Sequence, residues 1–204
     1  HPSNQSPSGG SEGNSVKLNA NGMEIFKGNT SVAFYGDTAR VGKTSSGYTT
    51  IQGAGMKVYG NDGTTELANV GYGEGYDALD AESPAPYYTF GVRKSGSDIG
   101  NYSIAEGKDI TASKYTSHAE GENTTASAYA AHAEGVGTIA SGYASHEKGD
   151  ASDASDYTSH AEGDSTTASG ESSHAEGFHT SADGDYSHAE GQRAVANGSS
   201  SHAE

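Results

Sequence analysis

The second half of the chain repeats a fourteen-residue unit, which reads Tyr-x-Ser-His-Ala-Glu-Gly-x-x-Thr-Thr-Ala-Ser-Gly. A glycine recurs at this spacing without any insertion, at Gly107, Gly121, Gly135, Gly149, Gly163, Gly177 and Gly191. A histidine column and an alanine column keep the same spacing, from His118 to His202 and from Ala112 to Ala196. A fixed short period indicates a solenoid, in which each unit forms one coil that stacks on its neighbours.

The composition of the unit favours short β-strands. Each unit carries one or two glycines with many Ser and Thr residues and has no apolar helical face, which excludes a helix. Because successive side chains of a strand point to opposite faces, the Ser, Ala and Gly of Ser-His-Ala-Glu-Gly share one face, and the His and Glu share the other. The Thr, Ala and Gly of Thr-x-Ala-Ser-Gly share a face in the same way. We therefore predict an all-β fold with a parallel β-roll over residues 101–204, each coil holding two short strands and two tight turns.

Coils of this kind have little apolar surface to bury. Of 204 residues, 21 are Val, Ile, Leu or Phe, and six of these lie beyond residue 100. Burying a methyl-sized group stabilises by about 0.8 kcal/mol, whereas ordering each residue costs about 1 to 2 kcal/mol. We therefore expect neighbouring copies of the chain to supply the missing contacts, as a homotrimer, because cyclic symmetry lets one face of each roll meet the others.

The stretch Asn-Tyr-Ser-Ile-Ala-Glu-Gly at 101–107, followed by Asp-Ile-Thr-Ala-Ser, resembles the head repeat of trimeric autotransporter adhesins of the YadA type. The Ser-His-Ala-Glu-Gly form is similar to a variant found in tail-fibre and appendage proteins of phages and prophages. The resemblance covers residues 101–204 and implies a trimeric, left-handed β-roll, located on a virion or on a cell surface.

Where the family has Val and Ile facing neighbouring subunits, this chain has His and Glu. We expect the two columns to meet across chain interfaces as charge-assisted hydrogen bonds, which would raise the His pKa values in the trimer. The alternative is that both columns face solvent, where such pairs contribute about 0 to 1 kcal/mol. The candidate binding residues are His118, Glu120, His132, Glu134, His146, Lys148, His160, Glu162, His174, Glu176, His188 and Glu190.

Two coils depart from the pattern. Ile104 stands at the first His position, and we expect it to be an apolar plug where the roll meets the preceding segment. In another coil Glu147 replaces the Ala and Lys148 replaces the Glu. Lys148 should relieve the repulsion between Glu134 and Glu162. A carboxylate inside so narrow a roll is costly, so we expect the coil of Glu147 to bulge.

The first part of the chain has a different pattern. Residues 14–76 alternate apolar and polar residues around Gly-rich turns and contain a looser repeat, which predicts an antiparallel β-meander module of intertwined trimeric strands. A hairpin turn is predicted at 60–65. Most of the large apolar residues lie here, among them Val32, Phe34, Val41, Ile51, Val58, Tyr59 and Leu67.

The remaining segments are predicted to be irregular. Residues 1–13 read as a flexible linker and residues 77–100 as a connector with two prolines. Within the connector, Arg93 and Lys94 form the one adjacent basic pair, and we expect them to contact nearby acids such as Asp98.

Composition excludes several classes of function. The net charge of −16 without a basic cluster excludes nucleic acid and anionic membrane surfaces as partners, and the lack of Cys excludes a thiolate metal site. The Ser and His of one unit point to opposite faces, and a site copied in every coil lacks the asymmetry of an active site. We therefore expect no catalytic residue and no cofactor. The carboxylates of Asp153 and Asp156 are expected on the solvated surface.

Three binding alternatives remain open. Three symmetry-related His side chains at one height of a trimer could hold a transition-metal ion on the axis, or else a network of His, Glu and water. A regular Thr column could bind ice, but Ser152 and Ala194 interrupt it. Stacked tyrosines at Tyr115, Tyr129, Tyr143 and Tyr157 could bind sugars, although protection of a turn is the favoured interpretation.

The sequence thus predicts a structural, non-enzymatic segment of a phage or prophage tail fibre or similar appendage. Such a segment would space or present a tip that binds a host receptor or glycan. The alternative is the head of a trimeric adhesin on a bacterial surface.

Overall fold

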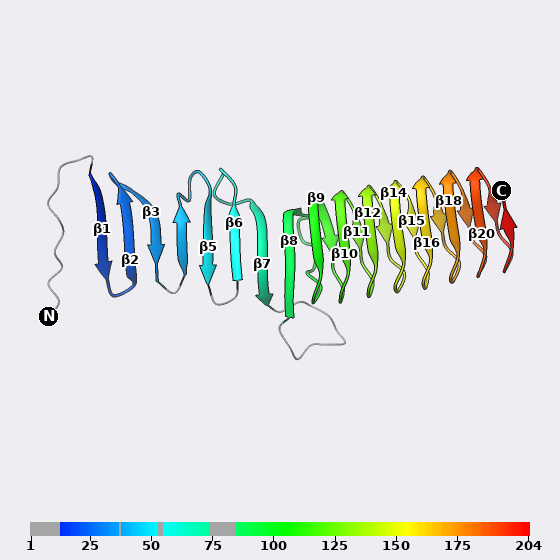
Figure 1. The fold of residues 1–204 in the computed structure, drawn as a ribbon, viewed down its shortest axis with the longest axis horizontal. Coiled ribbons are helices and arrows are strands. Elements are labelled where there is room, and N and C mark those ends of the chain that lie inside the picture. Colours follow the sequence, from blue (N-terminus) through cyan, green and yellow to red (C-terminus); the bar gives the residue numbers. More distant parts are fainter. Residues whose placement is uncertain (1–12, 37, 53–54, 74–84) are drawn as a thin grey trace. The chain divides into compact units, whose positions relative to one another are not determined.

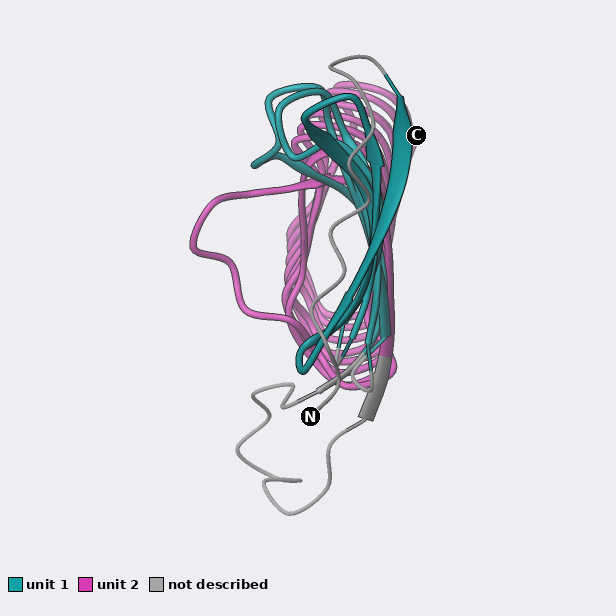
Figure 2. Cartoon of the chain, turned by 90° about the vertical axis from the view of Figure 1, so that its left-hand side faces the viewer, with its two compact units in different colours: residues 1–71 teal, residues 72–204 magenta. Residues whose placement is uncertain are grey.

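The computed structural model describes residues 13–36, 38–52, 55–73 and 85–204. The linker predicted for residues 1–13 therefore lies outside the described residues, except for its last residue. The chain divides into two compact units, residues 1–71 and 72–204, which are coloured separately in Figure 2. All regular structure in the described ranges is β-strand. Within these ranges no helix has the length and apolar character needed to cross a membrane.

The first unit is an antiparallel meander, in which each strand pairs with the next one along the chain (Figure 1). This confirms the predicted meander. The last strand extends two residues beyond the boundary of the unit. The strands are β1 (Asn14–Asn19), β2 (Gly22–Lys27), β3 (Thr30–Tyr35), β4 (Ala39–Gly42), β5 (Tyr48–Gln52), β6 (Gly55–Tyr59) and β7 (Glu66–Gly73).

The turn between β6 and β7 lies at the predicted position. Asp62 organises it, because its carboxylate accepts hydrogen bonds from the backbone N–H of Thr64 at 2.9 Å and of Thr65 at 2.8 Å, and another from the Thr65 hydroxyl. These bonds favour the charged form and lower the pKa of Asp62 to about 2. The backbone N–H of Gly60 closes the turn on the Thr65 carbonyl oxygen at 2.8 Å.

The pairing of the meander gathers most of its aliphatic side chains on one face, called here the apolar face. Residues in register across the strands share a face of the sheet, as do residues two apart along a strand. One such row contains Val16, Ile25, Ala33, Val41, Thr49, Val58 and Ala68. The adjacent row contains Leu18, Met23, Tyr35, Ala39, Ile51, Met56 and Val70.

The opposite face of the meander is mixed, because Phe34 lies in register with Glu24 and Arg40, and Tyr48 stacks on Tyr59 beside the polar residues. Lys57 forms an ion pair with Glu66 at 2.8 Å, and the guanidinium of Arg40 donates to the Ser31 hydroxyl at 2.7 Å. Among the described residues of this unit, Ala33 is the only apolar side chain that is fully buried, whereas Val41 and Ile51 are each 53% exposed. The large apolar residues found in the sequence therefore do not form a closed core within one chain.

The second unit is the predicted parallel β-roll. Each coil contributes a longer strand and a two-residue strand, and each strand pairs in parallel with its counterpart fourteen residues on, as His118 does with His132. Figure 2 shows the coils end on as a flattened loop with two walls. The strands are β8 (Ala85–Arg93), β9 (Ile104–Ala112), β10 (His118–Glu122), β11 (Thr125–Ala126), β12 (His132–Val136), β13 (Ile139–Ala140), β14 (His146–Asp150), β15 (Asp153–Ala154), β16 (His160–Asp164), β17 (Thr167–Ala168), β18 (His174–Phe178), β19 (Ser181–Ala182), β20 (His188–Gln192), β21 (Val195–Ala196) and β22 (His202–Ala203).

The interior of the roll is built from small side chains, as predicted. The Ala column is buried in both walls, with Ala119 and Ala126 at 0% exposure. Ser117 and Thr124 are buried with it, and Ile110 is the largest fully buried apolar side chain in the described ranges. The handedness of the coil and the assembly into trimers remain predictions.

The glycine column follows from the close approach of successive coils. Gly121 has φ +116°, and a Cβ atom built on it would lie 1.9 Å from the carbonyl oxygen of Gly135. No side chain fits there, and a left-handed φ of this size disfavours every other residue. The turns use left-handed backbone at residues other than glycine, as at Thr116 with φ 54° and Asn123 with φ 57°.

Part of the segment predicted to be a connector pairs with the roll, while its residues 77–84 lie outside the described residues. Strand β8 lies inside residues 77–100 and pairs in parallel with β9, with Tyr88 opposite Ile104 and Gly91 opposite Gly107. The two glycines are sixteen residues apart, and the pairing shifts between Val92 and Arg93, so the fourteen-residue period does not reveal this strand.

Two smaller expectations also change. Ile104 is 39% exposed and sits in the outward His column, so the prediction of an apolar plug was wrong. The Arg93 guanidinium donates a hydrogen bond to the backbone carbonyl oxygen of Asp98 at 3.2 Å, and not to its carboxylate. It also donates to the Ala112 carbonyl oxygen and to the Thr89 hydroxyl.

Candidate functional site

The histidines form a continuous stack on the outer wall of the roll. In-register pairing of the longer strands places each imidazole over the next, with ring centroids 4.6–4.9 Å apart and interplanar angles of 2–20° from His118 to His202. The rings are half-buried from His118 to His188, because neighbouring rings cover their faces. The stack fixes the orientation of every ring between its neighbours.

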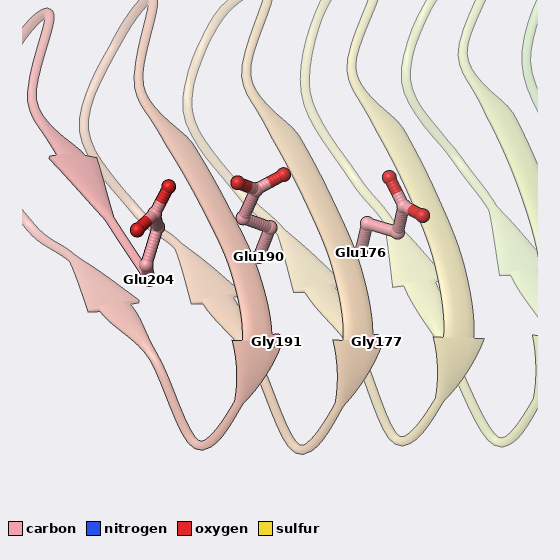
Figure 3. Close-up of a pocket in the computed structure, with 5 residues that line it drawn as sticks. All are labelled: Glu176, Gly177, Glu190, Gly191 and Glu204. Atoms are coloured by element: carbon pink, nitrogen blue, oxygen red, sulfur yellow. The ribbon is translucent and has the colours of Figure 1, made fainter.

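The glutamates form a second column on the same wall, two residues further along each strand. Glu176, Glu190 and Glu204 extend to the same side of three successive coils (Figure 3). With Gly177 and Gly191 they line a shallow hollow of about 350 Å³. The outward position predicted for the His and Glu columns is therefore what the structure shows.

Within one chain the two columns approach each other without closing hydrogen bonds. The His118 Nε2 atom lies 3.9 Å from Glu120 Oε2, and His188 Nε2 lies 3.7 Å from Glu190 Oε2. Both distances exceed a hydrogen bond. In the described residues, five of the imidazoles have a buried Nε2 atom without a hydrogen-bond partner, namely those of His118, His132, His160, His174 and His188.

Burial disfavours the charged form of three histidines in the stack. The pKa values of His132, His160 and His174 are lowered, first by burial and then by the repulsion between neighbouring imidazolium ions, while the glutamates oppose this more weakly. Contact with Glu in a trimer was expected to raise these pKa values. Inside a single chain the direction is the opposite, because each ring faces two other rings at stacking distance.

Three groups of His and Glu on this wall bring together one ligand atom from each member within 4.8 Å. The groups are Glu106–His118–Glu120, Glu120–His132–Glu134 and Glu190–His202–Glu204. Each takes one glutamate from the coil before the histidine and one from the coil of the histidine. Glu106 was missed in the sequence because Ile104 replaces the histidine of its coil, although the Ala-Glu-Gly at 105–107 marks its position.

The coil of Glu147 is regular, so the prediction of a bulge was wrong. Strand β14 keeps its pairing with both neighbours, with Glu147 opposite Ala133 and Ala161. Its side chain is 0% exposed, and neither carboxyl oxygen has a hydrogen-bond partner of ordinary geometry among the described residues. Burial raises the pKa of Glu147 to about 8, against a smaller lowering by the Thr138 hydroxyl. A neutral carboxylic acid can occupy the interior without the desolvation cost of a charge.

Two further predictions concern residues near Glu147. Burial also raises the pKa of Asp153, which is half-buried with an enclosed Oδ1 atom and so is only partly on the solvated surface predicted for it, whereas Asp156 is exposed. The Lys148 ammonium lies 3.7 Å from Glu134 Oε1. Lys148 therefore offsets the charge of Glu134 as expected, and its pairing with Glu162 stays a prediction.

The Ser and the His of one repeat unit lie on opposite sides of the strand. Ser117 points into the roll, where its hydroxyl donates to the Lys114 carbonyl oxygen at 2.7 Å, and His118 points outward. The Thr column is also interior, with Thr124, Thr138, Thr166 and Thr180 at most 1% exposed, so it offers no surface to ice.

The tyrosine column lies at the turns. Tyr115, Tyr129, Tyr143 and Tyr157 stack in sequence with centroids 4.9–6.1 Å apart, and Tyr102 meets Tyr115 edge to face at 5.2 Å. Each ring precedes a left-handed turn residue, such as Thr116 or Thr158. This position agrees with protection of the turn, since the rings bury their faces against one another.

The sequence matches no known protein family, and no curated protein matches it.

Proposed function

We propose that the chain is a structural, non-enzymatic segment of a homotrimeric fibre, of the kind found in phage or prophage tail fibres and related appendages. It would space or present a tip that binds a host receptor or glycan. The observation that carries this proposal is the uncovered apolar face of the meander.

The apolar face is large and continuous across the strands of the first unit. Leu18 is 73% exposed at one end of it, and Val41 and Ile51 are each 53% exposed near the middle. Exposed apolar surface of this extent indicates an interaction site, and a sheet of one layer needs a partner on its apolar face. The opposite face carries the Lys57–Glu66 ion pair and the Arg40–Ser31 hydrogen bond, so it is the more polar of the two faces.

A second copy of the same chain is the occupant that the proposal names, since it brings an equal apolar face. Three copies related by a three-fold axis would cover all three apolar faces at once. The small interior of the roll supports the same assembly, because Ala, Ser and Thr side chains supply little apolar burial for each coil. In the assembly the outward His and Glu columns would face neighbouring chains.

The roll has the properties of a spacer. Each coil pairs only with the coils before and after it in the described residues, and the register repeats from β10 to β22. Length in such a solenoid increases coil by coil without a change in cross-section. The resemblance of residues 101–204 to YadA-type heads, which are trimeric, supports this use of the fold.

Sedimentation equilibrium of the full chain tests the proposal. The expected mass is about three times the chain mass of 20.7 kDa. The variant Ile51→Asp places a charge on the apolar face and should shift the mass to that of one chain, while Thr50→Asp, its neighbour on the more polar face of β5, should leave the trimer intact. A folded wild-type chain that sediments as a monomer at micromolar concentration would overturn the proposal.

A further inference from the structure

We propose that the outer wall of the roll at residues 106–134 binds divalent transition-metal ions of the Zn²⁺ class. Each ion would be held by one imidazole nitrogen and two glutamate carboxylates from consecutive coils of the same chain. The first site contains Glu106, His118 and Glu120, and the second contains Glu120, His132 and Glu134. Unlike an ion on the axis of a trimer, these sites are complete within one chain.

The spacing of the ligand atoms fits such an ion. Metal–ligand bonds of about 2.0 to 2.1 Å at a tetrahedral angle place two ligand atoms about 3.3 Å apart. The separation of His118 Nε2 from Glu120 Oε2 is 3.9 Å, too long for a hydrogen bond and a few tenths of an ångström wider than two such bonds require. A small rotation of the glutamate side chain closes the difference.

The nitrogen atoms are free to serve as ligands. The Nε2 atoms of His118 and His132 are buried and have no hydrogen-bond partner in the described part of the chain. The two rings stack at 4.6 Å with an interplanar angle of 5°, so their orientation is set before an ion arrives. A site whose ligands are already oriented loses little conformational entropy on binding.

The charge and chemistry of the groups select the class of ion. Two carboxylates in each group, in a chain with a net charge of −16, attract cations. An imidazole nitrogen combined with carboxylate oxygens suits Zn²⁺ and its neighbours in the first transition row. Ca²⁺ takes six to eight oxygen ligands and Mg²⁺ an octahedral set, which a group of three ligand atoms with one nitrogen does not supply.

The next coil interrupts the glutamate column, so that coils with and without a predicted site can be compared in one chain. Lys148 takes the place of the glutamate beside His146, and its ammonium pairs with Glu134. Glu162 and Glu176 belong to none of the groups in the described residues. The same residue type in the same column therefore occurs with and without a predicted site.

Glu120 belongs to both sites. Its two carboxylate oxygens can each contact one ion, so the loss of this single side chain should weaken two sites together. The third group, Glu190–His202–Glu204, repeats the arrangement and should bind an ion in the same way, although His202 is more exposed than the other rings of the stack.

Equilibrium dialysis of the full chain against ZnCl₂ near pH 7.5 tests the proposal through a graded set of variants. Wild type should bind three ions per chain. Glu162→Gln should bind three, Glu106→Gln should lose tight binding at one site, and Glu120→Gln at two, with affinity reduced at least about tenfold at each lost site. Far-ultraviolet circular dichroism checks that each variant keeps the roll.

A second readout separates ligation from general attraction to an acidic surface. Co²⁺ bound by wild type should give the visible absorption of four-coordinate cobalt, which should weaken in Glu120→Gln and persist in Glu162→Gln. Wild type that retains no Zn²⁺ at micromolar concentration overturns the proposal. Equal losses in Glu120→Gln and Glu162→Gln, or displacement of Zn²⁺ by equimolar Mg²⁺, overturn it as well. The sites are complete within one chain, and sedimentation equilibrium of the same sample reports the oligomeric mass separately.

Discussion

Glu147 should make the stability of the roll depend on pH. Burial raises its pKa from 4.5 to about 8. The folded chain therefore keeps a proton that the unfolded chain releases between these values, so the free energy of unfolding falls as pH rises. Integrated with 1.36 kcal/mol for each pKa unit, the loss between pH 5 and pH 9 is about 4 kcal/mol per chain. The loss is nearly complete once the pH exceeds the folded pKa.

The substitution Glu147→Ala restores the Ala column and removes this dependence. The assay is urea denaturation followed by circular dichroism at pH 5 and at pH 9, on wild type, Glu147→Ala and the control Glu162→Ala. Other groups titrate in the same range, so the quantity of interest is the difference between variants. Glu147→Ala should be more stable than wild type at pH 9 by several kcal/mol, and Glu162→Ala should follow wild type.

Two outcomes would refute the reasoning. One is a wild type and a Glu147→Ala variant that lose the same stability between pH 5 and pH 9, since the carboxyl group would then not be the cause. The other is a Glu147→Ala variant that is less stable than wild type at pH 9. The charged carboxylate would then stabilise the coil, which requires hydrogen-bond partners that the structure does not show for it.

Three further predictions concern single positions. Gly121→Ala should destabilise the roll by about 3 kcal/mol or more in urea denaturation, because its Cβ would meet the Gly135 carbonyl oxygen at 1.9 Å, whereas Gly191→Ala, with no atom nearer than 3.9 Å, should cost clearly less. The Asp62 carboxyl should titrate near pH 2 in a carbon-detected NMR titration, so its stabilisation of the turn is present above its usual pKa and lost as pH falls through 2; a midpoint near 3.8 would contradict the hydrogen bonds. The imidazoles of His160 and His174 should titrate below 6.5 by NMR, and the stability that depends on their neutral form is lost as pH falls below that value; midpoints above 6.5 would mean that contacts with carboxylates outweigh burial.

The roll could be predicted from the sequence because its pattern is local. A period of fourteen residues with Ala and Ser at alternate positions determines which side chains face inward, and Ala119 and Ser117 are buried as expected. Strand β8 could not be predicted from the repeat, because Gly91 and Gly107 are sixteen residues apart. These two residues more than the period of fourteen break the pattern, although the strands still pair.

The errors at the site have electrostatic causes. A bulge was expected at Glu147 on the assumption that the carboxyl group is charged, but a raised pKa allows it to remain neutral in a regular strand. The pKa values of His132, His160 and His174 are lowered mainly by burial within the stack, and residue type alone does not reveal that burial. Prediction of the apolar face of the meander would have required the register of every strand pair. That register is set by turns such as the one at Asp62.

Because equivalent residues pair in every coil, the length of the roll can change only in steps of one coil. Adding or removing fourteen residues between two successive coils, for instance between Gly163 and Gly177, would leave every remaining pair in place. The length of the roll would change by about 4.8 Å. Insertion or removal of whole units keeps the interior alanines inside, whereas one residue added within a strand would turn the side chains that follow it to the other face.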